Sequence, residues 1–212
     1  MMSYTEIYAI HKNGDVRLYE ENKNSWRWSP QIWGELEERH LPVLRPRFVP
    51  NYIKDEQVEE YLGYKPKRHG PDDLKEVWNL FSTDKVNSVE RWVLGSTYDN
   101  VIVMKEDFED LIKAYRSFYQ EENGTSLLEL ADIYEKMQKD DDIIGVAWSI
   151  SLIGNPWLDI EWVDESHPEF DEYNVYDEED GLAQIDVPYN IFESEKKHWV
   201  LTKQLAETGK EE

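Results

Sequence analysis

Cysteine is absent from the 212 residues of the chain. Its absence excludes disulfide bonds, thiolate zinc sites and cysteine nucleophiles. Long apolar runs are also missing, and no stretch approaches the roughly 18 apolar residues that cross a bilayer. The first ten residues lack a basic segment followed by an apolar one, the pattern of a secretory signal. We therefore predict a cytoplasmic protein with no membrane contact.

The motifs of several common enzyme classes are missing as well. The chain has neither GxxxxGK[ST] nor GxGxxG, the glycine-rich loops whose backbone N–H groups bind phosphates. It has no GxSxG nucleophile elbow and no HExxH zinc helix. The five histidines are far apart in the sequence. These absences favour a non-catalytic protein, and we expect no cofactor.

Lys and Arg do not occur in residues 140–195, which contain seventeen acidic residues. Residues 1–70 hold eleven basic and eleven acidic side chains, so the net charge of −23 comes from residues 71–212. Such a field repels nucleic-acid phosphates and attracts basic surfaces. We predict a basic protein partner and no direct contact with nucleic acid. The alternative is that these charges only keep the surface solvated.

Nine of the acidic residues fall within residues 164–180, which we predict to be an acidic loop. The candidate partner-binding residues are Asp164, Glu165, Glu169, Asp171, Glu172, Asp177, Glu178, Glu179 and Asp180.

Carboxylates also bind hard cations, which supports a second hypothesis of an enzyme or metal-binding protein with a carboxylate site near residues 140–180. The weak candidate ligands are Asp140, Asp141, Asp142, Asp177 and Asp180. EF-hand spacing fails here, because Gly181 is fifth rather than sixth from Asp177 and Pro188 is twelfth. We therefore expect a solvated loop in preference to a dedicated metal site.

The N-terminal region predicts a β-hairpin followed by a helix. Asn13-Gly14 separates two β-favouring runs, residues 4–10 and 16–19, and this dipeptide is typical of a type I′ turn with positive φ at both positions. A helix that ends before Pro42 should follow, with Ile32, Trp33 and Leu36 on its buried side.

The sequence allows two start positions for that helix. Ser25 and Ser29 are both suitable first residues, and Pro30 follows the second. Trp26 and Trp28 precede the apolar stripe, and their polar neighbours leave open whether these rings are core or exposed.

Residues 42–71 contain five of the nine prolines and are the most basic part of the chain. We predict a surface segment or a linker, with a helix over residues 52–61. This segment is expected to lie against the acidic half of the same molecule or of a neighbour. The alternative is that this basic segment binds nucleic acid. The prolines and interspersed acids argue against that alternative.

Apolar periodicity predicts the remaining elements. Helices are expected over residues 71–81, 88–95, 108–119 and 126–137, and strands over 101–104, 143–153, 157–163 and 184–187. The strands at 143–153 and 157–163 are expected to pair antiparallel, the latter as a half-exposed strand. A disordered end is expected at residues 208–212.

This order of elements lacks a regular βαβ rhythm. We therefore predict one α+β domain over residues 1–212, with an N-terminal β-hairpin plus helix, central helices and a largely antiparallel sheet.

Three blocks carry a resemblance to a known group of proteins. They are residues 4–42 (YTEIYAIHKNGDV through WGELEERHLP), residues 76–118 (EVWNLFSTDKVNSVERWVLGSTYDNVIVMKEDFEDLIKAYRSF) and residues 187–201 (VPYN to KHWVL). They resemble uncharacterised proteins of Gram-positive bacteria and their phages or prophages. The resemblance covers most of the chain and implies a protein that acts inside a bacterial host. It assigns no activity and no functional residues.

Overall fold

The computed structural model describes residues 5–22, 28–41, 52–63, 73–118, 126–149, 156–170, 175–177 and 181–210. The strands are β1 (Thr5–His11), β2 (Val16–Asn22), β3 (Val101–Met104), β4 (Ile143–Ser149), β5 (Leu158–Val163), β6 (Val175–Asp177), β7 (Leu182–Pro188) and β8 (Trp199–Val200). The helices are α1 (Ser29–His40), α2 (Asp55–Leu62), α3 (Asp73–Asn79), α4 (Ser88–Gly95), α5 (Phe108–Phe118), α6 (Ser126–Lys139) and α7 (Lys203–Thr208). Two 3₁₀ turns, η1 (Leu80–Ser82) and η2 (Lys105–Asp107), complete the described elements.

The strands form two sheets. The larger has the order β2-β1-β4-β3-β8, and the smaller has the order β5-β7-β6. Within the described residues all strand pairs are antiparallel except β3 with β8. The fold is therefore α+β with a mostly antiparallel main sheet, as predicted.

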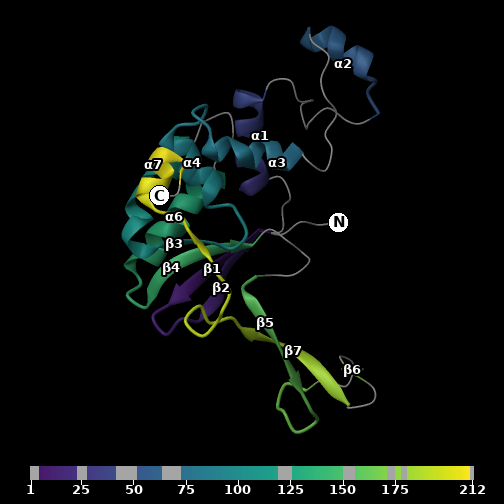
Figure 1. Ribbon diagram of the computed structural model, residues 1–212, viewed down its shortest axis with the longest axis vertical. Helices are drawn as coiled ribbons and strands as arrows, with labels where there is room; N and C mark the ends of the chain where they lie inside the picture. Colours follow the sequence, from purple (N-terminus) through teal and green to yellow (C-terminus); the bar gives the residue numbers. More distant parts are fainter. Residues whose placement is uncertain are drawn as a thin grey trace.

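Helices pack on one face of the main sheet, and the small sheet projects from the body as an arm (Figure 1). We call the β5-β7-β6 sheet the arm. The helix-covered face holds the larger core, in which Leu36, Leu94, Tyr115 and Tyr134 are fully or almost fully buried. The opposite face holds a smaller cluster of Tyr8, Ile10, Val16, Ile102, Ala147, Trp157 and Tyr189. Burial on both faces explains why β1, β3 and β4 are nearly continuous apolar runs.

The N-terminal hairpin is confirmed, but its turn differs from the predicted type. Only Gly14 has positive φ, at 91°, and Asn13 does not. His11 N–H donates to the Asp15 carbonyl at 2.9 Å, which closes a three-residue loop. Three-residue loops place a single left-handed residue at their end, so one glycine suffices. A side chain at Gly14 would also collide with Asn190 and Phe192.

Helix α1 begins at Ser29, with Pro30 in its first turn. The predicted side is buried, with Ile32, Trp33 and Leu36 at most 7% exposed. Ser29 lies inside the helix and makes no cap, because Trp28 occupies the N-cap position with φ of 59°. Trp28 itself is core, packed 6.3 Å from the Trp148 ring. Trp26 lies outside the described residues.

The predicted pairing of residues 143–153 with residues 157–163 is wrong. Strand β4 has β1 on one side and β3 on the other, so both of its edges are already hydrogen-bonded. Strand β5 instead pairs with β7 in the arm. Strands β4 and β5 are therefore close in the sequence but belong to different sheets.

The chain end also differs from its prediction. Residues 203–208 form α7, and Gly209 caps it with φ of 69° while its N–H donates to the Leu205 carbonyl at 2.8 Å. Gly209 is packed so closely that a Cβ would lie 2.6 Å from the Phe81 carbonyl oxygen. Residues 208–210 are therefore ordered, whereas 211 and 212 lie outside the described residues.

Most of the proline-rich segment 42–71 lies outside the described residues, but α2 belongs to it. Figure 1 places α2 and the arm at opposite ends of the long axis. The described part of this segment therefore does not lie against the arm of the same molecule. None of the described helices is long and apolar enough to cross a membrane.

Candidate protein-binding site

The root of the arm is a cluster of aromatic rings on the face of the main sheet opposite the helices. Trp157 comes just before β5 and is fully buried, and its indole Nε1 donates to the Trp148 carbonyl at 2.6 Å. Its ring stacks on His198 with 4.9 Å between centroids and meets Tyr189 edge-on at 6.0 Å. Tyr189 follows β7 and is also fully buried. Leu158 pairs with Pro188, so Trp157 and Tyr189 flank the same end of the β5–β7 pair and fix that end to the body.

Two further hydrogen bonds stabilise this root, and its histidine is neutral. The Tyr189 hydroxyl and His198 Nε2 lie 2.5 Å apart, and Val16 N–H donates to the Tyr189 carbonyl at 2.8 Å. Burial, with a smaller contribution from Lys196, holds the pKa of His198 below its ordinary value of 6.5. The imidazole is therefore neutral near pH 7, which suits an aromatic cluster that contains no carboxylate.

The arm itself has little core. Among its described side chains only Val163 and Ala183 are buried. In β5, Ile160 and Trp162 are 58% and 50% exposed. These residues alternate with Asp159 and Glu161, so the strand places apolar groups on one face and carboxylates on the other. An exposed Ile–Trp pair on a projecting strand is typical of a protein-binding surface.

Three of the predicted partner-binding acids lie in the turns after β5. Asp164, Glu165 and Glu169 are exposed. The hydroxyl and backbone N–H of Ser166 donate to Asp164, which lowers the pKa of that carboxyl and keeps it ionised. These acids therefore extend the charge of the arm beyond β5.

The other predicted acids are only partly placed. Asp177 lies in β6, so the predicted loop 164–180 contains a strand. Its side chain is not described. Asp171, Glu172, Glu178, Glu179 and Asp180 lie outside the described residues.

The aspartates at residues 140–142 stabilise the turn before β4. Asp140 Oδ1 accepts the Asp142 N–H at 2.9 Å, and Asp142 Oδ2 lies 2.7 Å from His11 Nδ1. Within the described part of the chain, no three His, Asp or Glu side chains are arranged to hold a metal ion. The side chains of Asp177 and Asp180, the remaining candidate ligands, are not described.

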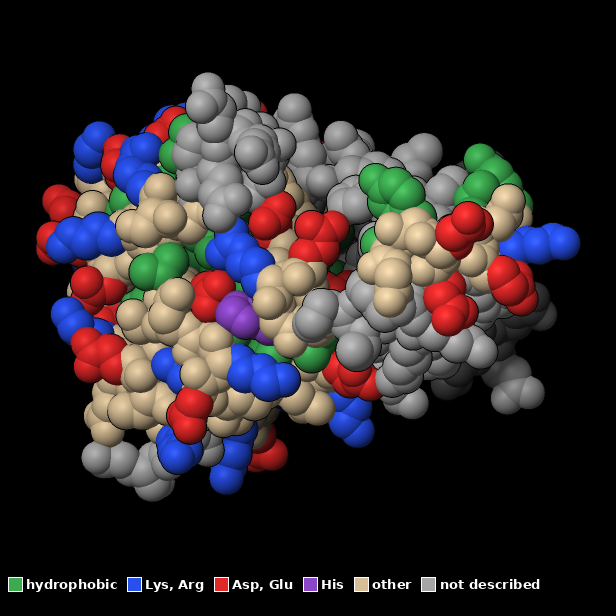
Figure 2. Space-filling model, turned by 90° about the horizontal axis from the view of Figure 1, so that it is seen from above, with side chains coloured by type: hydrophobic (Ala, Val, Ile, Leu, Met, Phe, Trp, Pro, Cys, Tyr) green, Lys and Arg blue, Asp and Glu red, His purple; other side chains and the backbone are tan. Residues whose placement is uncertain are grey.

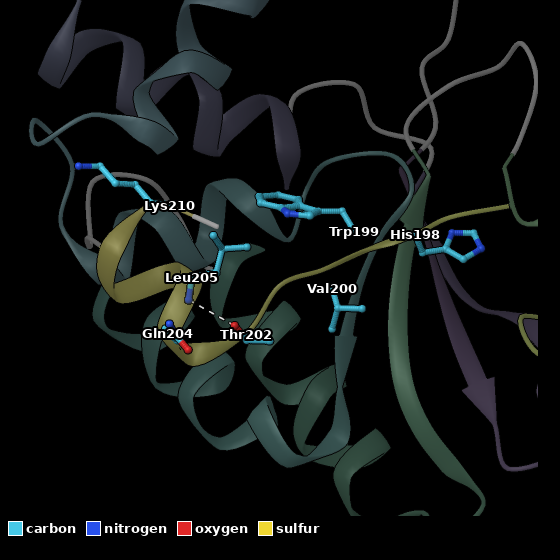
Figure 3. Close-up of a pocket in the computed structure, with 7 residues that line it drawn as sticks. All are labelled: His198, Trp199, Val200, Thr202, Gln204, Leu205 and Lys210. Atoms are coloured by element: carbon cyan, nitrogen blue, oxygen red, sulfur yellow. Dashed lines mark hydrogen bonds between the residues drawn. The ribbon is translucent and has the colours of Figure 1, made fainter. Parts of the chain in front are cut away.

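A shallow hollow lies beside the C-terminal helix (Figure 3). One part, of about 340 Å³, is lined by His198, Trp199, Val200, Thr202, Gln204, Leu205 and Lys210. A second part, of about 590 Å³, shares three of these residues and adds Trp78, Asn79, Phe81, Ser82, Tyr98 and Gly209.

The aromatic rings of this hollow pack mainly against each other. Trp199 stacks on Tyr98 at 5.8 Å and meets Phe81 edge-on at 5.1 Å. In Figure 3 the rings of Trp199 and His198 extend to opposite sides of the chain. Trp199 therefore joins the helical core while His198 joins the arm root. The hollow therefore lies where α7 packs against the body.

Ile160, Tyr189 and His198 lie in no sequence pattern that predicts a function. The alternation in residues 157–163 correctly indicated a half-exposed strand, and that was the available signal. The root joins residues 157, 189 and 198 through tertiary packing, for which the sequence holds no local pattern. Comparison of the chain with protein-family models, curated proteins and solved structures finds no match, so the resemblance to the phage-borne group stays a prediction.

Proposed function

We propose that the protein is a non-catalytic acidic binding protein whose arm binds a basic surface of a partner protein. The observation that carries this proposal is the combination of charge and shape. Residues 140–195 lack Lys and Arg altogether, and three of the strands within this range, β5, β6 and β7, form an arm that projects from the body (Figure 1). Carboxylates on a projecting element attract and orient a cationic surface before contact.

The body offers a different electrostatic surface. On the face seen in Figure 2, Lys and Arg side chains are interspersed with Asp and Glu. Arg116 of α5, for example, lies 2.8 Å from Asp132 and 2.7 Å from Glu135 of α6. Such pairs cancel at a distance, so a cationic partner would be drawn to the acidic arm. If the protein is encoded by a phage, the partner is a nucleic-acid-binding protein of the host, and the carboxylates occupy the positions of phosphates.

The proposal is tested by isolating partners from a bacterial lysate on the immobilised protein. A basic partner should be retained at low salt and released steeply as salt rises, because screening weakens exposed charge pairs. Asp164→Asn, Glu165→Gln and Glu169→Gln together should weaken retention of that partner.

The matched control neutralises three exposed acids of α2, with Glu56→Gln, Glu59→Gln and Glu60→Gln. It changes the net charge equally at the opposite end of the molecule. Retention that is insensitive to salt, or that falls equally in both triple variants, would contradict a role for the acidic arm.

A further inference from the structure

Strand β5 carries two different chemistries on alternate residues. Leu158, Ile160 and Trp162 share one face, and Asp159 and Glu161 share the other. In β7 the residue paired with Trp162 is Gln184. The neighbouring strand therefore does not continue the apolar face beside Trp162, and Ile160 and Trp162 are 58% and 50% exposed.

Strand β5 is also an edge strand. It pairs with β7 along one side, and no other strand in the described part of the chain pairs with its second side. An edge strand presents N–H and C=O groups that another extended chain can bind. Addition of a strand at such an edge is a known mode of protein recognition, in which main-chain bonds supply affinity and alternate side chains supply specificity.

We propose that the edge of β5 binds an extended segment of the partner in which apolar residues alternate with Lys or Arg. This inference rests on the proposed function, because it places the basic partner at one strand. The added strand would align its apolar side chains beside Ile160 and Trp162 and its cations beside Asp159 and Glu161. Opposite charges and apolar pairs across neighbouring strands each stabilise by about 0.2–1 kcal/mol.

Lys196 shows that a cation fits beside the face of β5 that carries Asp159 and Glu161. Lys196 Nζ lies 3.0 Å from Asp159 Oδ1 and 4.8 Å from the centroid of the Tyr189 ring. Both members of the ion pair are about half exposed, at 51% and 46%. An exposed pair of this kind is weak, so a cation of the partner can compete for Asp159 while Glu161 accepts the next one.

A second copy of the chain is a poor occupant of the same edge. Pairing β5 with β5 would bring Asp159 and Glu161 of two molecules into neighbouring rows, and like charges across strands are destabilising. The acidic face therefore opposes edge-to-edge self-association and favours a basic strand.

Two labelled peptides of equal charge and about twelve residues test this inference. One alternates Lys with Val and the other alternates Lys with Ser. Fluorescence anisotropy should show that the Lys–Val peptide binds about tenfold more tightly than the Lys–Ser peptide, with both affinities falling as salt rises. In the double variant Ile160→Thr, Trp162→Thr, which keeps β-favouring residues, this gap should shrink below about threefold.

The matched control is Leu18→Thr, which removes a 51% exposed apolar side chain from β2, an edge strand of the other sheet. It should leave the tenfold gap intact. Equal but salt-sensitive binding of the two peptides, or a gap that survives the double variant, overturns the β5 inference while the basic-partner function stands. Absence of salt-sensitive binding by either peptide overturns the basic-partner function and the inference that rests on it.

Discussion

Arg91 is a buried cation that holds the C-terminal helix, and its removal should destabilise the fold strongly. The residue is 6% exposed in α4. Its Nε donates to the Phe81 carbonyl at 2.9 Å and its Nη2 to the Thr83 carbonyl at 2.8 Å. Nη1 donates to the Glu207 carbonyl at 3.0 Å, near the end of α7. One guanidinium therefore joins three segments through backbone oxygens, and it also faces the negative end of the α7 dipole.

The expected cost follows from these bonds. Each hydrogen bond from a charged donor contributes about 1.5–3 kcal/mol net, and desolvation of the guanidinium offsets part of the sum. Arg91→Met keeps an unbranched chain but leaves the carbonyls without this donor, so we expect a loss of about 3–5 kcal/mol in the free energy of unfolding. Arg91→Lys should recover less than half, because an ammonium is a compact group that cannot span both sets of carbonyls.

Urea unfolding followed by circular dichroism measures this loss, and hydrogen exchange at the Gly209 amide reports the docking of α7. A helix of six residues has no stability of its own, so exchange at Gly209 should accelerate in both variants. The control is Arg116→Met, whose exposed side chain pairs with Asp132 and Glu135 and should cost at most about 1 kcal/mol. A cost below about 1 kcal/mol for Arg91→Met would refute the proposed role of the guanidinium.

Three further predictions concern the core, the arm root and the acidic residues. Trp33→Ala should cost about 3–5 kcal/mol by urea unfolding, because the ring is buried and Nε1 donates to Thr97 Oγ1 at 3.0 Å; an unchanged stability would contradict this. The lowered pKa of His198 means that the unfolded chain binds its proton first, so stability should fall as the pH drops below 6.5, and His198→Gln should reduce that pH dependence. Addition of Ca²⁺, Mg²⁺ or Mn²⁺ at about 1 mM should shift the melting temperature by less than about 1 °C, and saturable stabilisation at low concentration would instead support a carboxylate metal site.

The helices were the most predictable part of the fold. The apolar spacing of Phe108, Leu111, Ile112, Tyr115 and Phe118 predicted α5, and all five side chains are buried. Pro30 and the stripe of α1 likewise predicted a helix at the right place. In each case the information lies within about four residues, because side chains three and four apart share a helical face.

The candidate site was less predictable than the helices. The excess of acid after residue 140 is a property of composition, and the structure carries part of it on a projecting arm. Exposure of Ile160 and Trp162 depends on what β7 places beside them, which no pattern within β5 specifies. The neutral arm root likewise depends on His198, which is forty-one positions after Trp157 in the numbering.

The sequence alone determined the charge, the helices before α7, the N-terminal hairpin and the α+β class, because composition, periodicity and turn residues act locally. Tertiary structure decided which strands are neighbours. The pairing of β4 with β1 rather than with β5 and the docking of α7 on Arg91 both join residues far apart in the chain. Such contacts depend on burial of whole faces and on which edges are still open, so only the folded chain separates the arm from the body and exposes its acidic strand.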